Sequence, residues 1–552
     1  MSLLKIQGGR VVDPAHGRDE VADIWVDRGL IIAIPTDPNI KPDRIIDASG
    51  DVVMAAGVDV HCHVVGSKVS AGRALRPEEA RRGGGFARSA DPRSRSGTRG
   101  TIPSTYSTGA QYAGLGYATA LDAAIAPLGA RQAHLEFQDT PILDKAFLIL
   151  LGNNHYVMER LRNGESDPER LSAYVAWILA TTGALGVKVV NPGGVETWKQ
   201  GGSRIAALDD IVPGFATTPR QILVGLAETV ERLGVPHPLH LHGLNLGLPG
   251  NAETTLETMR ALDGRRAHFA HIQFHSYGGD PGDSASLRSD VPRLVEYFQA
   301  HPNLSLDVGQ VMFGEATAMT ADGAVGQFLH ELTGRKWFSH DVELETGCGI
   351  VPITYENKSF VHALQWAIGL EWYLSVDDLW RVALSTDHPN GAAFMAYPHV
   401  IALLMDKGLR DEMLAAAPAL VRERCGLADH CREFSLSEIA IITRAAPARL
   451  MGLPNKGHLG PGADGDLTIY RPDADIRRMF SMPRYLIKAG EVVLDDGDLR
   501  SWPQGTTWRA TPARNLDAER SIETWFNAHS TIRFDNFGID AAEFAGWKGV
   551  KS

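Results

Sequence analysis

The chain has 552 residues, of which 44% are hydrophobic and 22% charged, the composition of an ordinary globular protein. Its formal net charge of -12 argues against nucleic-acid binding, and no apolar run approaches the ~20 residues that a membrane-spanning helix needs. Residues 1–6 lack the apolar core of a signal peptide, so we expect the cytoplasm as the location. The four cysteines form no Cys-x-x-Cys pair and are expected to be free thiols.

Both ends of the chain have the pattern of short strands separated by turns. Asp-Pro, Asp-Arg-Gly and Ala-Ser-Gly breaks separate the N-terminal strands, and a similar pattern returns late in the chain. The predicted strands are 4–8, 10–12, 24–27, 30–34 and 44–47, then 465–470 and 485–494. We therefore predict one small β-sandwich domain built from both termini.

The middle of the chain alternates apolar strands with amphipathic helices. One strand ends at His61, and the others are 117–125, 145–151, 184–190, 238–242, 267–273, 304–308 and 380–386. The clearest helices are 168–182 and 219–233, the second with Pro219 at its first position and Gly234 as a stop. Eight strand–helix units predict an α/β fold, a (β/α)₈ TIM-type barrel. An open doubly wound sheet is disfavoured because no Gly-x-Gly-x-x-Gly follows a strand.

The expected organisation has four parts: 1–54 and 453–500 as the two pieces of the β domain, 55–452 as the barrel, and 501–552 as a C-terminal extension. We expect the extension to lie over the body or to contact a partner. An Arg-rich insertion at 73–99 has two interpretations that stay open. It is either a solvent-exposed loop or a cradle for a polyanionic substrate tail, because guanidinium groups bind carboxylates in a fork.

A His-x-His pair, His61 and His63, ends the first barrel strand and precedes a Gly-rich loop at 66–72. Alternate residues of a strand share a face, so the two imidazoles would point the same way. That arrangement suits a divalent metal such as zinc, although an isolated pair is more often packed or exposed without a metal. Further candidate ligands at later strand ends favour the metal.

Lys188 lies inside an apolar strand, Gly-Val-Lys-Val-Val. Burial of an unpaired ammonium group is costly, so its pKa should fall and make the amine nucleophilic towards CO₂. The resulting carbamate would be an anion able to bridge two metals. The alternative is an ion-paired lysine whose charged end reaches solvent.

Three more candidates follow at strand ends: His242, His271 and Asp387. His242 and His271 are one strand–helix unit apart, as neighbouring barrel strands require. Asp387 at the mouth of the last strand is suited to bind a metal and to accept a proton from water, or alternatively to cap the next helix. Active sites of such barrels lie at the carboxyl ends of the strands, so we expect these groups to meet there.

This order of ligands resembles the amidohydrolase superfamily in its dinuclear form with a carboxylated lysine. The stretch 445–453, followed by 462–467, is similar to that superfamily's return from the barrel to the β domain. The resemblance implies Asp387 as both ligand and general base. It also implies a dinuclear zinc (two Zn2+) centre with His61 and His63 on one ion, His242 and His271 on the other, and N6-carboxylated Lys188 between them.

The segments 61–69, 187–196 and 273–279 are similar to the A-type subunit of formylmethanofuran dehydrogenase and to its bacterial relative, the hydrolase subunit of the formyltransferase/hydrolase complex. This resemblance implies hydrolysis of N-formylmethanofuran, or of a related methanofuran-type C1 carrier, to formate and the free amine. No motif for molybdenum, tungsten or iron–sulfur centres is present, so CO₂ reduction or formyl transfer would belong to other subunits of the complex.

Several alternatives stay open. The abundance of Arg and Ala favours a bacterial hydrolase acting in C1 oxidation, but condensation of formate with methanofuran in an archaeal-type complex is a second candidate. A dihydropyrimidinase-like cyclic amidase and a non-catalytic scaffold of the same fold are the other candidates. Residues expected to contact substrate or to support the ligands are Lys68, Arg73, Asn191, His240, His275 and Tyr277.

Overall fold

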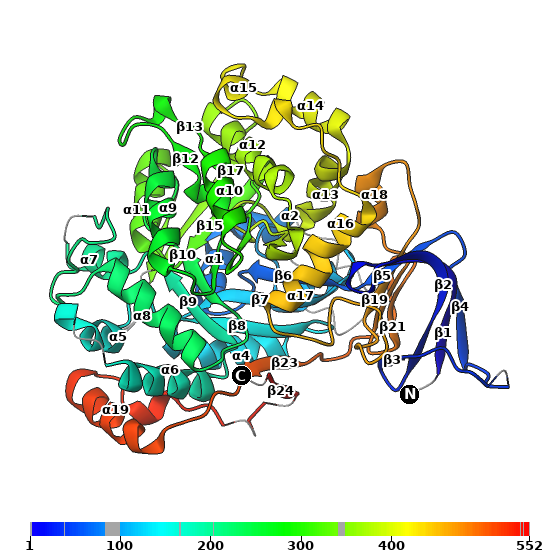
Figure 1. The fold of residues 1–552 in the computed structure, drawn as a ribbon, viewed down its shortest axis with the longest axis horizontal. Helices are drawn as coiled ribbons and strands as arrows, with labels where there is room; N and C mark the ends of the chain where they lie inside the picture. The colour runs from blue at the N-terminus through cyan, green and yellow to red at the C-terminus, as the bar shows by residue number, and fades with distance from the viewer. Residues whose placement is uncertain are drawn as a thin grey trace.

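The computed structural model describes residues 3–37, 39–82, 100–164, 167–201, 204–340, 348–540, 543–544 and 546–550. Figure 1 shows a barrel surrounded by helices, with a sheet of N-terminal (blue) and C-terminal (orange) strands beside it. No helix in these described ranges combines the length and the apolar character needed to cross a membrane. Most of the predicted Arg-rich insertion, from residue 83 to residue 99, lies outside the described residues.

The described chain forms a barrel of eight parallel strands, which confirms the predicted (β/α)₈ fold. A bridge between Cys62 and His388 joins the last strand to the first, and the backbone N–H of His63 donates to the carbonyl oxygen of His388 at 2.7 Å. The barrel strands are β6 (Gly57–Cys62), β7 (Tyr117–Ile125), β8 (Asp144–Leu150), β9 (Gly186–Val190), β10 (Leu239–His242), β11 (Ala267–Phe269), β14 (Leu304–Asp307) and β18 (Val382–Ala383).

Helices cover the outside of the barrel. The predicted helix at 168–182 is found with those bounds, and α8 begins with a capping box in which Thr218 and Gln221 exchange hydrogen bonds. The covering helices are α3 (Thr105–Ala113), α4 (Ala130–Gln138), α6 (Pro168–Thr182), α8 (Pro219–Arg232), α9 (Asn251–Leu262), α10 (Val291–Ala300), α12 (Phe360–Ser375) and α13 (Tyr397–Met405). Farther along the chain are α14 (Lys407–Ala416), α15 (Leu420–Arg424), α16 (Leu436–Ala440) and α17 (Ala446–Leu450).

The prediction of a Gly-rich loop after the His-x-His pair was wrong, because this segment forms helix α1 (Ser67–Leu75). Gly66, with φ of 91°, turns the chain into the helix, and the Lys68 ammonium anchors its first turn by donating to Asp122 at 2.9 Å. The predicted strand at 380–386 was too long. Its first residues form a 3₁₀ turn capped by Asp378, so only β18 remains as regular strand.

Strands from both ends of the chain form one continuous nine-stranded sheet within the described residues. The central contact is antiparallel, between β5 and β19, and a bulge between Ile6 and Gly9 merges two predicted strands into β1. The strands are β1 (Leu4–Asp13), β2 (Arg18–Asp27), β3 (Leu30–Ile32), β4 (Arg44–Asp47), β5 (Val52–Ala55), β19 (Leu467–Tyr470), β20 (Tyr485–Lys488), β21 (Glu491–Asp495) and β22 (Asp498–Leu499). The sheet encloses its own apolar core, whereas the predicted domain limits at residues 54, 452 and 500 stay predictions.

Buried charges join this sheet to the barrel. Asp144 at the start of β8 pairs with Lys488 of β20 at 2.7 Å, and Lys456 pairs with Asp466 at 2.6 Å. Lys456 also pairs with Asp144 and Asp464. The three carboxylates thus share two ammonium groups. We interpret this cluster as a structural link between the sheet and the barrel.

The C-terminal extension lies against the barrel. Strand β23 (Thr507–Ala510) pairs with β8 near Lys145, β24 (Trp547–Val550) pairs with β23, and α19 (Leu516–His529) packs on α6. Figure 1 shows this red segment along the lower edge of the molecule. It contacts the amino ends of the barrel strands, on the side away from the strand ends that carry the candidate site.

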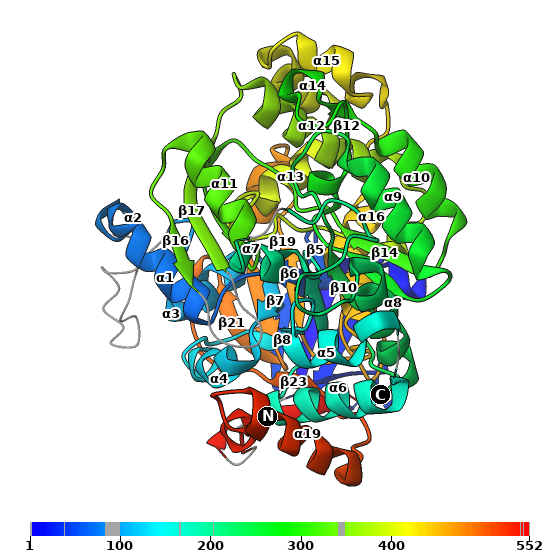
Figure 2. The same cartoon turned by 90° about the vertical axis from the view of Figure 1, so that its left-hand side faces the viewer.

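An insertion between β14 and α12 builds a small antiparallel sheet and a helix beside the barrel mouth. It contains β15 (Gly314–Thr320), α11 (Gly323–Thr333), β16 (Phe338–His340) and β17 (Cys348–Tyr355). Figure 2 shows it next to α1 and α2 (Pro77–Arg82). This insertion supplies much of the wall of the pocket described below.

Candidate metal centre at the barrel mouth

The backbone of β6 aims both histidines of the His-x-His pair at the mouth of the barrel. A register shift between Asp59 and Cys62 interrupts the pairing with β7, and the buried Asp59 carboxylate accepts the N–H of His61 at 3.0 Å. Tyr112 donates to the same carboxylate at 2.7 Å. Asp59 therefore holds the irregular strand end from which the two imidazoles project.

Both imidazoles converge on one carboxylate. The distance from Asp387 Oδ1 is 3.2 Å to His61 Nε2 and 3.1 Å to His63 Nε2. Possible ligand atoms of these three residues all lie within 4.8 Å of one another. Burial alone would raise the pKa of Asp387, but the neighbouring positive charge of His61 outweighs it and holds that pKa well below its usual value. Asp387 is therefore an ionised carboxylate, suited to bind a cation.

Two carboxylates that the sequence interpretation missed lie on the far sides of the His61 and His63 rings. Asp307 Oδ2, at the end of β14, lies 2.8 Å from His61 Nδ1 and 3.2 Å from His268 Nε2. Asp122 of β7 lies 3.7 Å from His63 Nδ1. A carboxylate that takes one imidazole nitrogen leaves the other free to bind a metal. Asp122 interrupts the mostly apolar strand β7, and Asp307 ends the buried strand β14; these positions are the sequence signals that could have identified the two carboxylates.

Lys188 lies in β9, beside His240 of β10, and its side chain points into the same space. It is 1% exposed, and its Nζ finds no hydrogen-bond partner among the described residues. Burial lowers the pKa of Lys188 to about 8. Such an amine is neutral far more often than an exposed lysine, and neutral amines react with CO₂.

His242 and His271 face Lys188 from the next two strands. His242 ends β10, but the predicted strand 267–273 was too long: β11 stops at Phe269, and His271 has φ of 36°. Gly309 makes this bend possible, because a Cβ there would lie 2.2 Å from the His271 Cβ. Burial holds the pKa values of both histidines well below the usual range, so each is a neutral imidazole with an available lone pair.

The donor atoms at this mouth fit divalent metal ions. Four of them are buried without a hydrogen-bond partner in the described structure: His61 Nε2, Lys188 Nζ, His242 Nε2 and His271 Nδ1. Unpartnered buried polar atoms are rare in folded proteins and call for an explanation such as an ion. Nitrogen ligands with one carboxylate are the set that zinc prefers.

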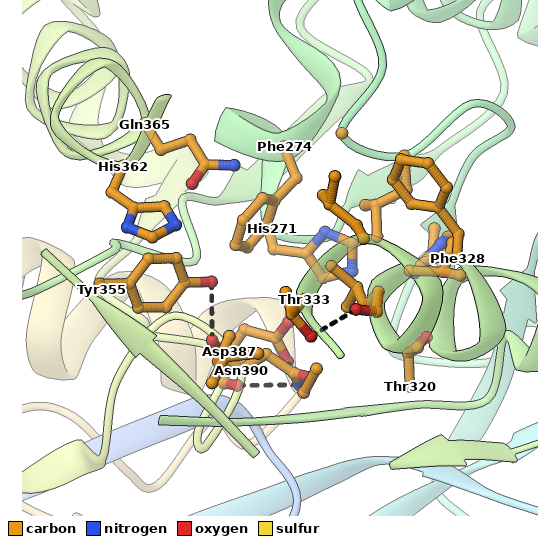
Figure 3. A pocket seen from close by; sticks show the side chains of 18 of the residues that line it. His271, Phe274, Thr320, Phe328, Thr333, Tyr355, His362, Gln365, Asp387 and Asn390 are labelled. Carbon is orange, nitrogen blue, oxygen red and sulfur yellow. Dashed lines mark hydrogen bonds between the residues drawn. The ribbon is translucent and has the colours of Figure 1, made fainter. Parts of the chain in front are cut away.

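The six predicted ligand positions all line one cavity of about 430 Å³. Its opposite wall is mainly apolar and comes from the insertion and α12, which the sequence interpretation did not assign to the site. These wall residues include Ala318, Val325, Phe328, Leu329, Leu332, Ile353, Tyr355, Val361 and Gln365. Figure 3 shows Phe274, Phe328, Tyr355 and Gln365 around Asp387 and His271. The cavity therefore joins a polar floor to an apolar wall.

A hydrogen-bonded chain links this wall to Asp387. Asn390 donates from Nδ2 to Asp387 Oδ1 at 2.9 Å and accepts the Met319 N–H of β15 at 2.6 Å. Tyr355 of β17 donates to the Asn390 carbonyl at 3.0 Å (Figure 3). The insertion and the carboxylate are thus held in a fixed relation.

The predicted substrate contacts do not lie on the wall of this cavity in the described structure. Lys68 donates to Asp122 at 2.9 Å, Arg73 donates to the Pro103 carbonyl at 3.0 Å, and Tyr277 is buried near Gln273. Asn191 has φ of 40° and donates its backbone N–H to the His242 carbonyl of β10, and His240 bridges His237 and His61 beneath the cluster. His275 lies beside His242 and His271. These six side chains stay without an assigned contact to substrate.

A parallel barrel with histidines, a lysine and a carboxylate at the carboxyl ends of its strands is the architecture of a metal-dependent hydrolase. A profile of the amidohydrolase family matches residues 44–494. The chain therefore belongs to the amidohydrolase family, as the resemblance predicted.

Two curated relatives match nearly the whole chain. Protein FwdA of Methanocaldococcus jannaschii is 42% identical over 99% of this chain and 98% of its own length. The A-type subunit of the formyltransferase/hydrolase complex Fhc of Methylorubrum extorquens is 40% identical over 98% of this chain and 97% of its own length. The second relative bears the name of the complex that the motifs at 61–69, 187–196 and 273–279 predicted.

The crystal structure of the formyltransferase/hydrolase complex FhcABCD from Methylorubrum extorquens, in complex with methylofuran, contains a chain of the same fold throughout. It superposes with a TM-score of 0.93 at 38% identity and covers 100% of this chain and 99% of that one. A D-aminoacylase, with a TM-score of 0.50 and 14% identity, covers 91% of this chain and 99% of its own and shares the fold alone.

Proposed function

We propose that this chain hydrolyses the formamide of a formylated furan-amine C1 carrier, such as N-formylmethanofuran, to formate and the free amine. The observation that carries the proposal is the joining of a His–Lys–Asp cluster to a largely apolar cavity of about 430 Å³. A formamide has a small reacting group, which suits the polar floor. Its furan-bearing amine needs apolar surface, which the insertion provides.

The proposed cofactors are two zinc ions. His61, His63 and Asp387 would hold one, His242 and His271 the other, and N6-carboxylated Lys188 would lie between them. Bound there, such ions lower the pKa of water towards ~7 and polarise a carbonyl oxygen. Support for the fit comes from the buried donor atoms without partners on His61, Lys188, His242 and His271.

Asp387 is the proposed general base. Its carboxylate takes a proton from the attacking water and passes it to the nitrogen of the leaving amine, while the new C–O bond replaces the C–N bond. Asn390 keeps the carboxylate oriented through its bond to Oδ1. The apolar wall excludes competing water from the reacting carbonyl.

The proposed partners are the other subunits of a formyltransferase/hydrolase complex, which supply the formylated carrier. The Methylorubrum relative, which is named as one of the subunits of such a complex, supports this assignment. A second candidate is the reverse reaction, condensation of formate with the carrier amine, which the resemblance implies for a complex of the archaeal type. Protein FwdA of Methanocaldococcus jannaschii is similar to this chain at about the same identity as the Methylorubrum relative. Hydrolysis and condensation use the same groups, so the direction depends on the partner subunits.

The test is a formate-release assay with N-formylmethanofuran and the purified complex. We expect formate in equal amount to the free amine, and no turnover of dihydrouracil, the substrate expected for a cyclic amidase. Turnover of dihydrouracil without release of formate would overturn the proposal and identify the protein as a cyclic amidase. Absence of both activities in a metal-loaded protein would favour a non-catalytic scaffold.

A further inference from the structure

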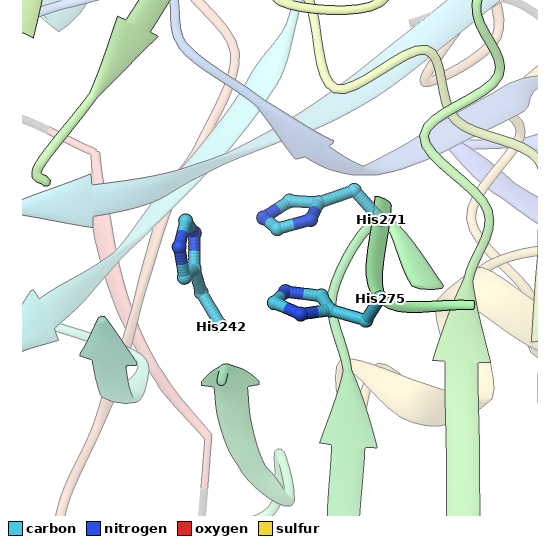
Figure 4. Close-up of side chains that lie close together, drawn as sticks. All are labelled: His242, His271 and His275. Carbon is cyan, nitrogen blue, oxygen red and sulfur yellow. The ribbon is translucent and has the colours of Figure 1, made fainter. Parts of the chain in front are cut away.

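A third histidine, His275, shares the second half of the candidate centre with His242 and His271. Possible ligand atoms on the three rings all lie within 4.8 Å of one another. The centroid of the His275 ring is 5.3 Å from that of His242 and 5.4 Å from that of His271. Figure 4 shows the three rings facing a common space, two from the turn after β11 and one from β10.

The ring of His275 has no other evident role in the described structure. It is 2% exposed, and neither of its nitrogens makes a well-aligned hydrogen bond to a described residue, although the backbone of Leu244 approaches it. Leaving a nitrogen of a buried imidazole unpaired is costly, since it has lost its hydrogen bond to water. A bound cation would satisfy such a nitrogen.

The turn that carries His271 and His275 is held rigidly. Thr255 donates to the His275 carbonyl at 2.7 Å, and Asn251 donates to the Phe274 carbonyl at 2.7 Å. Ser276 donates to the carbonyl of Ile272 at 2.7 Å. Together with the left-handed backbone of His271, these bonds bring side chains four residues apart to the same space. Strained backbone that is fixed by buried polar groups is typical of functional sites.

We infer that His275 is the third imidazole ligand of the second metal ion, beside His242 and His271. The inference rests on the dinuclear centre of the proposed function and deepens it. The two ions would then be bound differently: His61 and His63 with a carboxylate on one side, three neutral imidazoles on the other. Three histidines are a ligand set that zinc adopts in catalytic sites, and the carbamate of Lys188 would add a ligand shared with the first ion.

Metal titration of His275→Ala gives the first test. The apo complex is titrated with Zn²⁺ or Co²⁺, and bound metal is counted by mass spectrometry. We expect one of two equivalents to weaken by more than the roughly 10–100-fold that loss of a residue supporting a ligand costs. His268→Ala is the matched control, because His268 is also fully buried but contacts Asp307 and Ser305. The loss of metal affinity in His268→Ala should stay within that roughly 10–100-fold range.

His275→Cys loaded with Co²⁺ gives the deciding test. A thiolate bound to cobalt produces a near-ultraviolet charge-transfer band, so the band should appear in this variant and be missing in the wild type and in His268→Cys. Metal loss in His275→Ala without the band in His275→Cys would make His275 a supporting residue and overturn the inference. So would two equivalents of unchanged affinity in His275→Ala.

Neither measurement depends on turnover, so the two proposals fail separately. A wild-type complex that releases no formate while His275→Cys shows the band would overturn the proposed reaction and keep the ligand. Formate release by a wild type whose His275 variants bind metal normally would do the reverse.

Discussion

The carboxyl ends of the barrel strands and the insertion between β14 and α12 form opposite sides of one cavity, and they are built differently. The strand ends are almost completely buried, with carboxylates behind the imidazoles and hydrogen bonds along a continuous parallel sheet. In its described residues the insertion has a three-stranded sheet and one helix, and its pocket-lining side chains include Leu332, 68% exposed, and Phe328, 47% exposed.

This difference separates two tasks. Metal binding needs donor atoms held in a narrow geometry, which neighbouring strands of a closed sheet provide. Recognition of an apolar group needs area and shape, which side chains on an inserted segment supply with less demand on position. Changes at the strand ends should therefore affect turnover, and changes on the insertion should affect substrate affinity.

Metal removal should have the largest effect. A chelator is expected to abolish formate release, and Zn²⁺ together with bicarbonate should restore it more fully than Zn²⁺ alone, because a carbamate on Lys188 needs CO₂. Lys188→Ala should gain nothing from bicarbonate. If Zn²⁺ restored the same rate of formate release in CO₂-free buffer as it does with added bicarbonate, the carboxylated lysine would be contradicted. The measurement is the rate of formate release.

The Asp387→Asn variant should release formate roughly 10²–10⁴-fold more slowly than the wild type, because an amide cannot accept the proton of the attacking water. The variant should still bind metal. Metal content and kcat are measured on the same preparation. Full activity of the variant would show that another group is the base.

Asn390→Ala tests the link between the two sides. Loss of the 2.9 Å bond to Asp387 should lower kcat by about 10–100-fold with a smaller change in KM, as for other residues that orient a ligand. Asn390→Asp removes the amide donor but keeps the acceptor for the Met319 N–H. If Asn390 only supported β15, this variant would keep the wild-type kcat.

Leu332→Ser should have the smallest effect, raising KM by roughly fivefold with kcat nearly unchanged, since the side chain contributes only part of its surface to the cavity. Leu516→Ser is a matched control, because Leu516 on α19 is 65% exposed and does not line the cavity. A fall in kcat equal to the rise in KM would mean that the insertion also orders the strand ends.

The sequence alone predicted the barrel, most of its strand limits and the six residues that meet at its mouth. These elements follow from local patterns: apolar strands of regular spacing, helix caps such as Thr218, and polar residues at strand ends. In a closed parallel sheet every strand delivers its last residues to one rim, so order along the chain is enough to predict their meeting.

Tertiary structure decided the rest, because it depends on contacts between residues far apart in the chain. Asp307 reaches His61 across 246 positions, and Tyr355 reaches the loop of Asp387 only after the insertion folds back. The left-handed bend at His271, which turns His275 towards His242, needs Gly309 in the segment that follows β14. No periodicity in the sequence encodes such approaches, since they arise only when strands pack side by side.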